Sequence, residues 1–226
     1  MNQVQQRHQK LAITAMLGAL ALIVSLFIRV PGLFVSFLTY EPKDVILTLG
    51  GLLFGPFVGL GASLIACVLE LAIKGSTGLI GFFLNLLTSL FFIMPTVFLY
   101  RGKRRAQFRN LLLGLFLSVV SLTVVALLWN IILTPVFLNT TLDKVLPMIV
   151  PILLPFNLLK GFLNAGLLLL LYRPVSFALN QMGLKSLSLD MPVEGQRAKK
   201  ERIFSYAIGA FLFLTSCAVI YFLLHR

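Results

Sequence analysis

The chain has 226 residues, 59% of them hydrophobic and 12% charged, and its mean hydropathy is +1.00. A soluble domain is about half apolar and a quarter charged, so the composition excludes an ordinary soluble protein and predicts an all-α polytopic membrane protein. The formal net charge of +12 does not indicate a nucleic-acid partner, because the basic residues gather in short connectors between apolar runs, as in the cytoplasmic loops of membrane proteins.

Apolar runs near the roughly 20 residues that cross a bilayer predict the membrane spans. In chain order they cover residues 11–28, 43–73 (two spans divided at Gly55 and Pro56), 79–100, 111–134, 148–172 and 203–224. The predicted organisation is a six-span substrate-binding domain (1–175), a basic cytoplasmic linker (176–202) and an additional transmembrane helix (203–226). The first of the two spans within 43–73 is short for a full crossing.

The distribution of Lys and Arg predicts the orientation. With the N-terminus in the cytoplasm, thirteen basic residues fall on the cytoplasmic side and five on the outer side. Positive charge favours the cytoplasmic side of a bacterial membrane. We therefore expect a multi-pass protein of the bacterial plasma membrane, with the N-terminus inside and the C-terminus, after the seventh span, outside.

Small residues indicate close helix packing in the first half of the chain. Gly51, Gly55 and Gly59 recur every four residues, a spacing that lets membrane helices approach each other closely. A hinge at Gly55 is the functional alternative. The two cysteines, Cys67 and Cys217, lie in apolar runs and are expected to be small core residues.

The most unusual segment is "LPFNLLKGFLN" (154–164), which places an amine in the middle of a predicted span. Asn157, Lys160, Gly161 and Asn164 follow the helical period and form one stripe. An ionisable group in mid-bilayer is costly and usually faces the bundle interior. Lys160 is thus expected either to pair with an internal carboxylate or to bind a ligand, and we favour the ligand site.

Two other spans carry amides that could face the same interior. In "LLWNIILTP" (127–135), Asn130 and Thr134 lie on one helical face, and Trp129 is either part of the site or an interfacial anchor. Asn85 lies in the span before it. These side chains are candidates for lining a polar pocket.

The ionisable residues do not suggest catalysis. The two histidines, His8 and His225, lie near the two ends of the chain, so no histidine-based catalytic or metal site is expected in the bundle. Glu70 precedes Lys74 by one helical turn, and an ion pair between them is as good an interpretation as a functional role. An enzyme would depend on Asp44, Glu70 and the lysine of the stripe, so we predict that the protein is not an enzyme and holds no metal or covalent cofactor.

The connector "RVPGLFVSFLTYEPKDV" (29–45) is apolar and aromatic, interrupted by prolines, and ends with Tyr40, Glu41, Lys43 and Asp44. This composition is typical of a loop that folds back onto the protein and not of a solvated linker. We expect it to form a lid over an outward-facing pocket lined by amides, one amine and aromatic rings. Such a pocket suits a flat, hydrogen-bonding, partly apolar solute.

Four stretches of the sequence resemble a known protein family. They are "YEPKDVILTLGGLLFGPFVG", "STGLIGFFLNLLTSLFFIMPTVFLY", "LLWNIILTP" and "LPFNLLKGFLNAGLLLLLY". Together they resemble the substrate-binding (S) components of energy-coupling factor (ECF) vitamin transporters, and within them the riboflavin-binding (RibU-like) family. The resemblance extends over residues 10–175 and so includes all six expected spans.

The resemblance implies a six-helix bundle that captures riboflavin from outside beneath the loop between the first two spans. Asn130, Asn157 and Lys160 would hydrogen-bond the vitamin, and Asn164 would line the same site. Ala15 and Ala19 in the first span would pack against a transmembrane coupling protein, although ordinary small-residue packing is the alternative. The coupling protein would work with two ABC-type ATPases, so that ATP is used only by the partner subunits.

The resemblance leaves some questions open. The seventh span lies outside the six-helix plan, and the chain does not indicate its role. FMN or another vitamin is an alternative ligand. A stand-alone proton-coupled secondary transporter, with Asp44, Glu70 or Lys160 carrying the proton, is an alternative mechanism.

Overall fold

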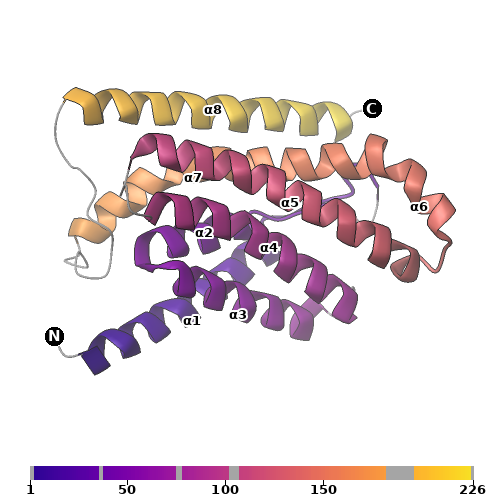
Figure 1. The fold of residues 1–226 in the computed structure, drawn as a ribbon, viewed down its shortest axis with the longest axis horizontal. Helices are drawn as coiled ribbons and strands as arrows, with labels where there is room; N and C mark the ends of the chain where they lie inside the picture. Colours follow the sequence, from indigo (N-terminus) through magenta and orange to yellow (C-terminus); the bar gives the residue numbers. More distant parts are fainter. Residues whose placement is uncertain (1–2, 36–37, 75–77, 102–106, 182–195, 225–226) are drawn as a thin grey trace.

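The computed structural model describes residues 3–35, 38–74, 78–101, 107–181 and 196–224, and these form a bundle of long helices with one small hairpin (Figure 1). The elements are α1 (Gln3–Phe27), β1 (Val30–Pro31), β2 (Thr39–Tyr40), α2 (Lys43–Phe54), α3 (Pro56–Lys74), α4 (Gly78–Arg101), α5 (Phe108–Phe137), α6 (Leu142–Met148), the π-helical turn η1 (Ile149–Leu153), α7 (Leu154–Gln181) and α8 (Gln196–Leu224).

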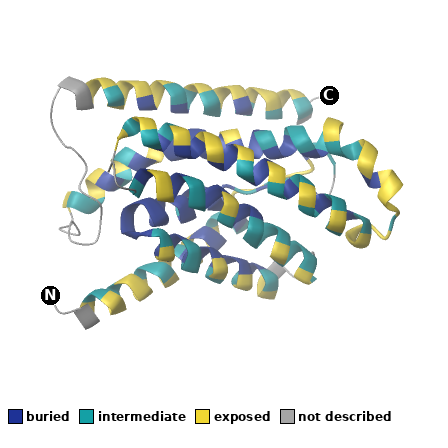
Figure 2. Ribbon diagram, viewed as in Figure 1, coloured by how far each residue is buried: buried dark blue, intermediate teal, exposed yellow. Residues whose placement is uncertain are grey.

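Six helices in the described part of the chain are long and apolar enough to cross a membrane. They are Gln5–Phe27, Pro56–Ile73, Gly78–Arg101, Phe108–Phe137, Leu142–Gln181 and Lys199–Leu223. Large apolar side chains remain exposed on their outer faces, most clearly on α1 and α8 (Figure 2). Such exposure would be unfavourable in water, but in a bilayer these faces meet lipid.

Helix α2 is different, because it lies at the centre of the bundle and is too short to span. It has 12 residues, about 18 Å at 1.5 Å per residue, against a hydrocarbon thickness of about 30 Å. Its first turn is buried, with Lys43 1% and Asp44 0% exposed. The prediction of a full crossing by this segment, and of Lys43 as an outer-loop residue, is therefore wrong.

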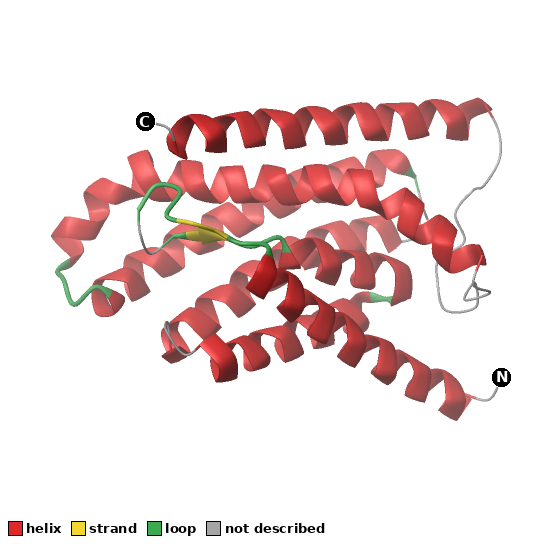
Figure 3. Cartoon of the chain, turned by 180° about the vertical axis from the view of Figure 1, so that it is seen from behind, coloured by secondary structure: helices red, strands yellow, loops and turns green. Residues whose placement is uncertain are grey.

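The described part of the connector between α1 and α2 contains a short hairpin. Val30 and Pro31 pair antiparallel with Tyr40 and Thr39. The hairpin lies against the bundle, close to the C-terminal end of α8 (Figure 3). Non-helical backbone is tolerated at membrane depth only where protein or an aqueous cavity surrounds it; here the strand pairing is continued by a hydrogen bond from the Gly32 amide to the Leu38 carbonyl at 2.9 Å.

Close packing of α2 on α3, predicted from the glycine spacing, is confirmed. A Cβ placed on Gly59 would lie 2.9 Å from the Cα of Gly51, so only glycine fits at this crossing. Gly55, with φ of +123°, adopts a conformation that L-residues rarely use and turns the chain from α2 into α3. The hinge interpretation of Gly55 stays a prediction.

The later helices extend beyond the predicted spans. Helix α5 continues to Phe137, and α7 continues to Gln181, so the connector to α8 is shorter than the predicted 176–202. Pro151 and Pro155 cannot donate backbone hydrogen bonds, and the helix widens there into η1, where the Leu154 amide donates to the Ile149 carbonyl. The turn leads directly into the polar stripe of α7.

Candidate substrate-binding site

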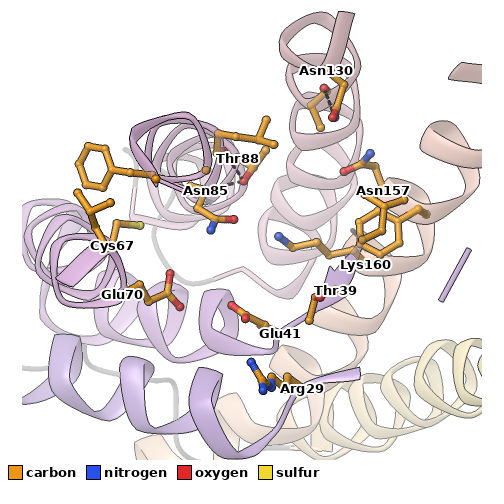
Figure 4. A pocket seen from close by; sticks show the side chains of 18 residues that line it. Arg29, Thr39, Glu41, Cys67, Glu70, Asn85, Thr88, Asn130, Asn157 and Lys160 are labelled. Carbon is orange, nitrogen blue, oxygen red and sulfur yellow. Dashed lines mark hydrogen bonds between the residues drawn. The ribbon is translucent and has the colours of Figure 1, made fainter. Parts of the chain in front are cut away.

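A cavity of about 210 Å³ lies between the connector, α3, α4, α5 and α7 (Figure 4). Its polar lining combines five amide and hydroxyl side chains with four charged ones, and its apolar lining includes aromatic rings. The residues are Arg29, Leu38, Thr39, Glu41, Cys67, Glu70, Leu71, Gly78, Gly81, Phe82, Leu84, Asn85, Thr88, Ala126, Asn130, Phe156, Asn157 and Lys160.

The amides of α5 and α7 are oriented by their own helices. Asn130 Nδ2 donates to the Ala126 carbonyl at 2.7 Å, and its Oδ1 accepts from Thr134 Oγ1 at 2.9 Å. Asn157 Nδ2 likewise donates to the Leu153 carbonyl at 2.7 Å. Each amide keeps one N–H for a ligand, so the two form a fixed set of hydrogen-bonding groups on one wall.

Lys160 projects from α7 into the cavity and is held from behind by Asp44. Its Nζ lies 3.6 Å from Asp44 Oδ2, and the two residues are 9% and 0% exposed. The same carboxylate accepts hydrogen bonds from Ser89 Oγ and, at 3.4 Å, from Asn164 Nδ2. Burying an ion pair is tolerated only when further hydrogen bonds satisfy the remaining lone pairs, and Ser89 and Asn164 provide them.

A second buried ion pair uses the neighbouring residue of α2. Lys43 Nζ pairs with Glu70 of α3 and lies 3.7 Å from Glu41. Glu70 thus takes part in a long-range pair; its predicted pairing with Lys74 stays a prediction, because the Lys74 side chain lies outside the described residues. Two adjacent residues at the start of α2 therefore join this helix to its neighbours: Lys43 joins it to α3, and Asp44 joins it to α7.

The connector is joined to the same network through Tyr40. The Tyr40 hydroxyl donates to Asn164 Oδ1 at 3.1 Å, and Asn164 in turn contacts Asp44. Burial, and next the charge of Asp44, raise the pKa of the Tyr40 phenol, so it remains a protonated donor. The fold-back of the connector that the sequence predicts is confirmed: Leu33 is 3% and Leu38 is 9% exposed.

The predicted site residues fall into three groups. Five line the cavity: Asn85, Asn130, Asn157, Lys160 and Glu70. Three lie behind it, where they hold Lys160 and the connector: Tyr40, Asp44 and Asn164. Trp129 does not line the cavity and is half-buried on α5.

Some lining residues were not predicted as site residues. Arg29 and Glu41 were interpreted only as parts of the outer connector, and Cys67 as a core residue. Phe82 and Phe156 give no signal in an apolar run, because aromatic residues are common on lipid-facing surfaces. The signal that could have found Phe156 is its position directly before Asn157, at the start of the polar stripe.

Ala15 and Ala19 lie far from the cavity in the fold. Both are exposed on α1, on a face that also presents Leu11, Met16 and Ile23. Helix α1 lies on the opposite side of the bundle from α8 (Figures 1 and 3). The face is small-residue-rich and apolar, so a second membrane helix could approach it closely.

No group of three or more His, Cys, Asp or Glu side chains that could hold a metal ion occurs among the described residues. Three of the charged groups around the cavity, Glu41, Glu70 and Lys160, are instead engaged in ion pairs. The geometry is that of a binding cavity.

Comparison with known proteins agrees with this geometry. The family model described as "ECF transporter, substrate-specific component" matches residues 9–172. The chain is 28% identical over 175 residues to the riboflavin transporter RibU of Staphylococcus aureus (strain TCH60), covering 74% of this chain and 90% of that protein. It is also 28% identical over 166 residues to the riboflavin transporter FmnP of Bacillus subtilis (strain 168), covering 68% of this chain and 84% of that protein.

A solved structure of the S component of a bacterial ECF transporter is similar in fold. The TM-score is 0.66 at 26% sequence identity, with 76% of this chain and 98% of that chain covered. The predicted fold class, a six-helix S-component bundle with an additional C-terminal helix, is confirmed, and the protein is a transport component and not an enzyme. The chain belongs to the family of substrate-specific (S) components of ECF transporters.

Proposed function

We propose that this S component captures riboflavin from outside the cell and delivers it through an ATP-driven partner complex. The observation that carries the proposal is the wall formed by Asn130, Asn157 and Lys160, whose side chains line one cavity beneath a folded-back connector. The two curated relatives are both riboflavin transporters. A flavin matches the wall chemically, because one edge of its flat ring alternates carbonyl oxygens with an N–H group.

The residues can be assigned roles by their chemistry. The amides of Asn130 and Asn157 would donate to and accept from the ring edge, and Lys160 would donate to a ring carbonyl. Phe82 and Phe156 offer apolar contact to the ring. Asn85, Thr39 and the charged groups Arg29, Glu41 and Glu70 at the other side of the cavity would meet the hydroxylated chain.

Tyr40, Asp44 and Asn164 would act as positioning residues. Asp44 holds the Lys160 ammonium, and Tyr40 joins the connector to Asn164. The connector would serve as the lid that closes over the vitamin. Figure 1 shows the N-terminus at the same end of the bundle as the C-terminal ends of α4 and α7, and opposite the C-terminal end of α8. This arrangement supports a cytoplasmic N-terminus and an outer C-terminus.

Transport would require a membrane coupling protein and two ABC-type ATPases, with ATP used only by those partners. The exposed face of α1 that includes Ala15 and Ala19 would contact the coupling protein. A proton-coupled secondary transporter is less well supported, because Asp44, Glu70 and Lys160 are each held in a buried ion pair. Proton exchange would have to break one of these pairs.

The test is a titration of the purified protein in detergent with riboflavin, followed by quenching of flavin fluorescence. Asn157→Ala removes a cavity amide, and Asn180→Ala removes an amide from the same helix outside the cavity. We expect saturable binding that Asn157→Ala weakens about 5- to 10-fold, the value of one neutral hydrogen bond, and that Asn180→Ala leaves unchanged.

Absence of quenching by a folded, monodisperse wild-type sample would overturn riboflavin as the ligand. FMN and a panel of other vitamins would then be titrated in the same way. Uptake into vesicles that depends on ATP and on the partner subunits would distinguish the ECF mechanism from a proton-coupled one.

A further inference from the structure

Helix α8 is an addition to the family fold. The family match ends at residue 172, and α8 spans Gln196–Leu224. It runs alongside α7 for most of its length and ends near the hairpin of the connector (Figures 1 and 3). An added helix that faced only lipid would need no specific contacts with the bundle, yet α8 makes them.

The first contact fixes α8 on α7 by a close crossing of backbones. A Cβ on Gly166 would lie 3.0 Å from the Gly209 carbonyl oxygen, and a Cβ on Gly209 would lie 3.0 Å from the Leu169 Cβ. One turn away, Ser205 Oγ donates to the Leu169 carbonyl at 3.2 Å. Small residues and one polar contact are how membrane helices pack tightly, so α8 is docked at a defined position.

The second contact reaches the connector. Phe213, Cys217 and Ile220 of α8 pack against a buried apolar cluster shared by the connector and α7. The cluster comprises Leu33, Leu38, Tyr40, Leu153, Phe156, Leu159 and Leu163. Two of its members, Leu38 and Phe156, also line the cavity, so α8 is one layer of side chains from the proposed ligand.

We propose that α8 is a built-in brace that holds the connector closed over the cavity and slows release of the ligand. The identity of the ligand rests on the proposed function. The effect of α8 on the connector does not depend on that function. Opening the connector would withdraw Leu33 and Leu38 from the cluster and so break up the apolar surface on which α8 packs. Phe213, Cys217 and Ile220 therefore add to the free energy of opening without touching the ligand.

The brace leaves the other side of the molecule free. Helix α8 lies across the bundle from α1, whose outer face is exposed. Stabilising the closed connector and contacting a coupling partner through α1 thus use separate surfaces. The additional helix α8 therefore leaves the exposed face of α1 uncovered.

The experiment uses two pairs of variants of the full chain. Phe213→Ala removes a brace contact, and Phe211→Ala removes a ring that is 66% exposed on the same helix. Gly209→Leu disrupts the crossing with α7, and Ala207→Leu adds the same bulk on the exposed side of α8. Hydrogen exchange of the ligand-free protein at residues 30–35 and 38–40 measures opening of the connector directly.

We expect amide exchange in the connector to be faster by roughly 5-fold or more in Phe213→Ala and Gly209→Leu, and unchanged in both controls. Riboflavin dissociation, followed by stopped-flow fluorescence, is expected to speed up by a similar factor. Protection in α3 and α4, which contribute no side chain to the cluster, reports that each variant remains folded.

Unchanged exchange in both folded variants would overturn the brace, whatever the riboflavin data show. Failure of the wild-type protein to bind riboflavin would count against the proposed function alone, because faster exchange in Phe213→Ala and Gly209→Leu would still support the brace.

Discussion

The Tyr40 hydroxyl donates a hydrogen bond to Asn164 Oδ1 at 3.1 Å, and this contact joins the connector to the central helix of the site. Asn164 is 0% exposed and also donates to Asp44 Oδ2, the same oxygen that lies 3.6 Å from the Lys160 ammonium. The position of the connector and the position of the Lys160 ammonium are therefore set by one continuous network.

Removing this hydrogen bond should loosen the connector. We predict that Tyr40→Phe raises the riboflavin dissociation rate by roughly 5- to 10-fold, since one buried hydrogen bond is lost while the ring remains. The association rate should change little. Stopped-flow fluorescence measures both rates, with Tyr206→Phe on α8, outside the network, as the matched control. Equal dissociation rates in the two variants would contradict a role for Tyr40 in closure.

The Asp44–Lys160 pair should behave as a unit. Lys160→Met alone leaves the Asp44 carboxylate buried without its cation, which typically costs about 3–5 kcal/mol. Adding Asp44→Asn to Lys160→Met removes the stranded charge, so the double variant should be more stable than Lys160→Met, although it should still bind riboflavin weakly. Thermal unfolding of the two single variants and the double variant gives the coupling energy. Strictly additive losses would mean that the two side chains do not interact.

The crossing of α2 and α3 should not tolerate a methyl group. We predict that Gly59→Ala lowers the free energy of unfolding by roughly 1–3 kcal/mol, because the new Cβ would lie 2.9 Å from the Cα of Gly51. Phe57→Ala, at a site 85% exposed on the same helix, should change it by less than about 0.5 kcal/mol. Thermal denaturation in one detergent compares them. A Gly59→Ala protein as stable as the control would mean that the helices can separate at little cost.

The exposed face of α1 should matter for transport and not for binding. Ala15→Leu and Ala19→Leu add bulk at two exposed positions of α1, so riboflavin affinity in detergent should be unchanged. Co-purification with the coupling protein and ATP-driven uptake into vesicles should fall by an order of magnitude or more if two helices pack closely there. Ala207→Leu on α8 is the control. Full transport by both α1 variants would place the coupling surface elsewhere.

The polar residues of the membrane spans were predictable because the sequence isolates them in apolar surroundings. Asn157, Lys160 and Asn164 share a helical face, and a helical face can be read from spacing alone. That the three divide into a cavity wall and a supporting network could not be predicted, because the division depends on where Asp44 lies. Asp44 is 116 residues from Lys160 and belongs to a different element.

The same limit applies to Glu70 and to the length of α2. Glu70 has a cation one turn away in Lys74, and local pairing is the simplest expectation. The structure pairs Glu70 with Lys43 as well, a contact that spacing could not predict, because α2 begins inside the bundle and carries its first turn to that depth. Hydropathy alone does not distinguish a short helix in a bundle centre from an incomplete membrane span.

The short length of α2 also distinguishes opening of the site toward the outside from opening toward the cytoplasm. In the proposed orientation, the connector lies on the outer side of the site and would close it as a removable plug of hairpin and side chains. Withdrawing such a plug would exchange a few hydrogen bonds and apolar contacts and would leave the glycine crossing of α2 on α3 undisturbed. Outward opening would then require loop movement alone, whereas opening toward the cytoplasm would have to displace whole helices. The two sides of the membrane would thus face barriers of different height, the lower one on the side where the solute is scarce.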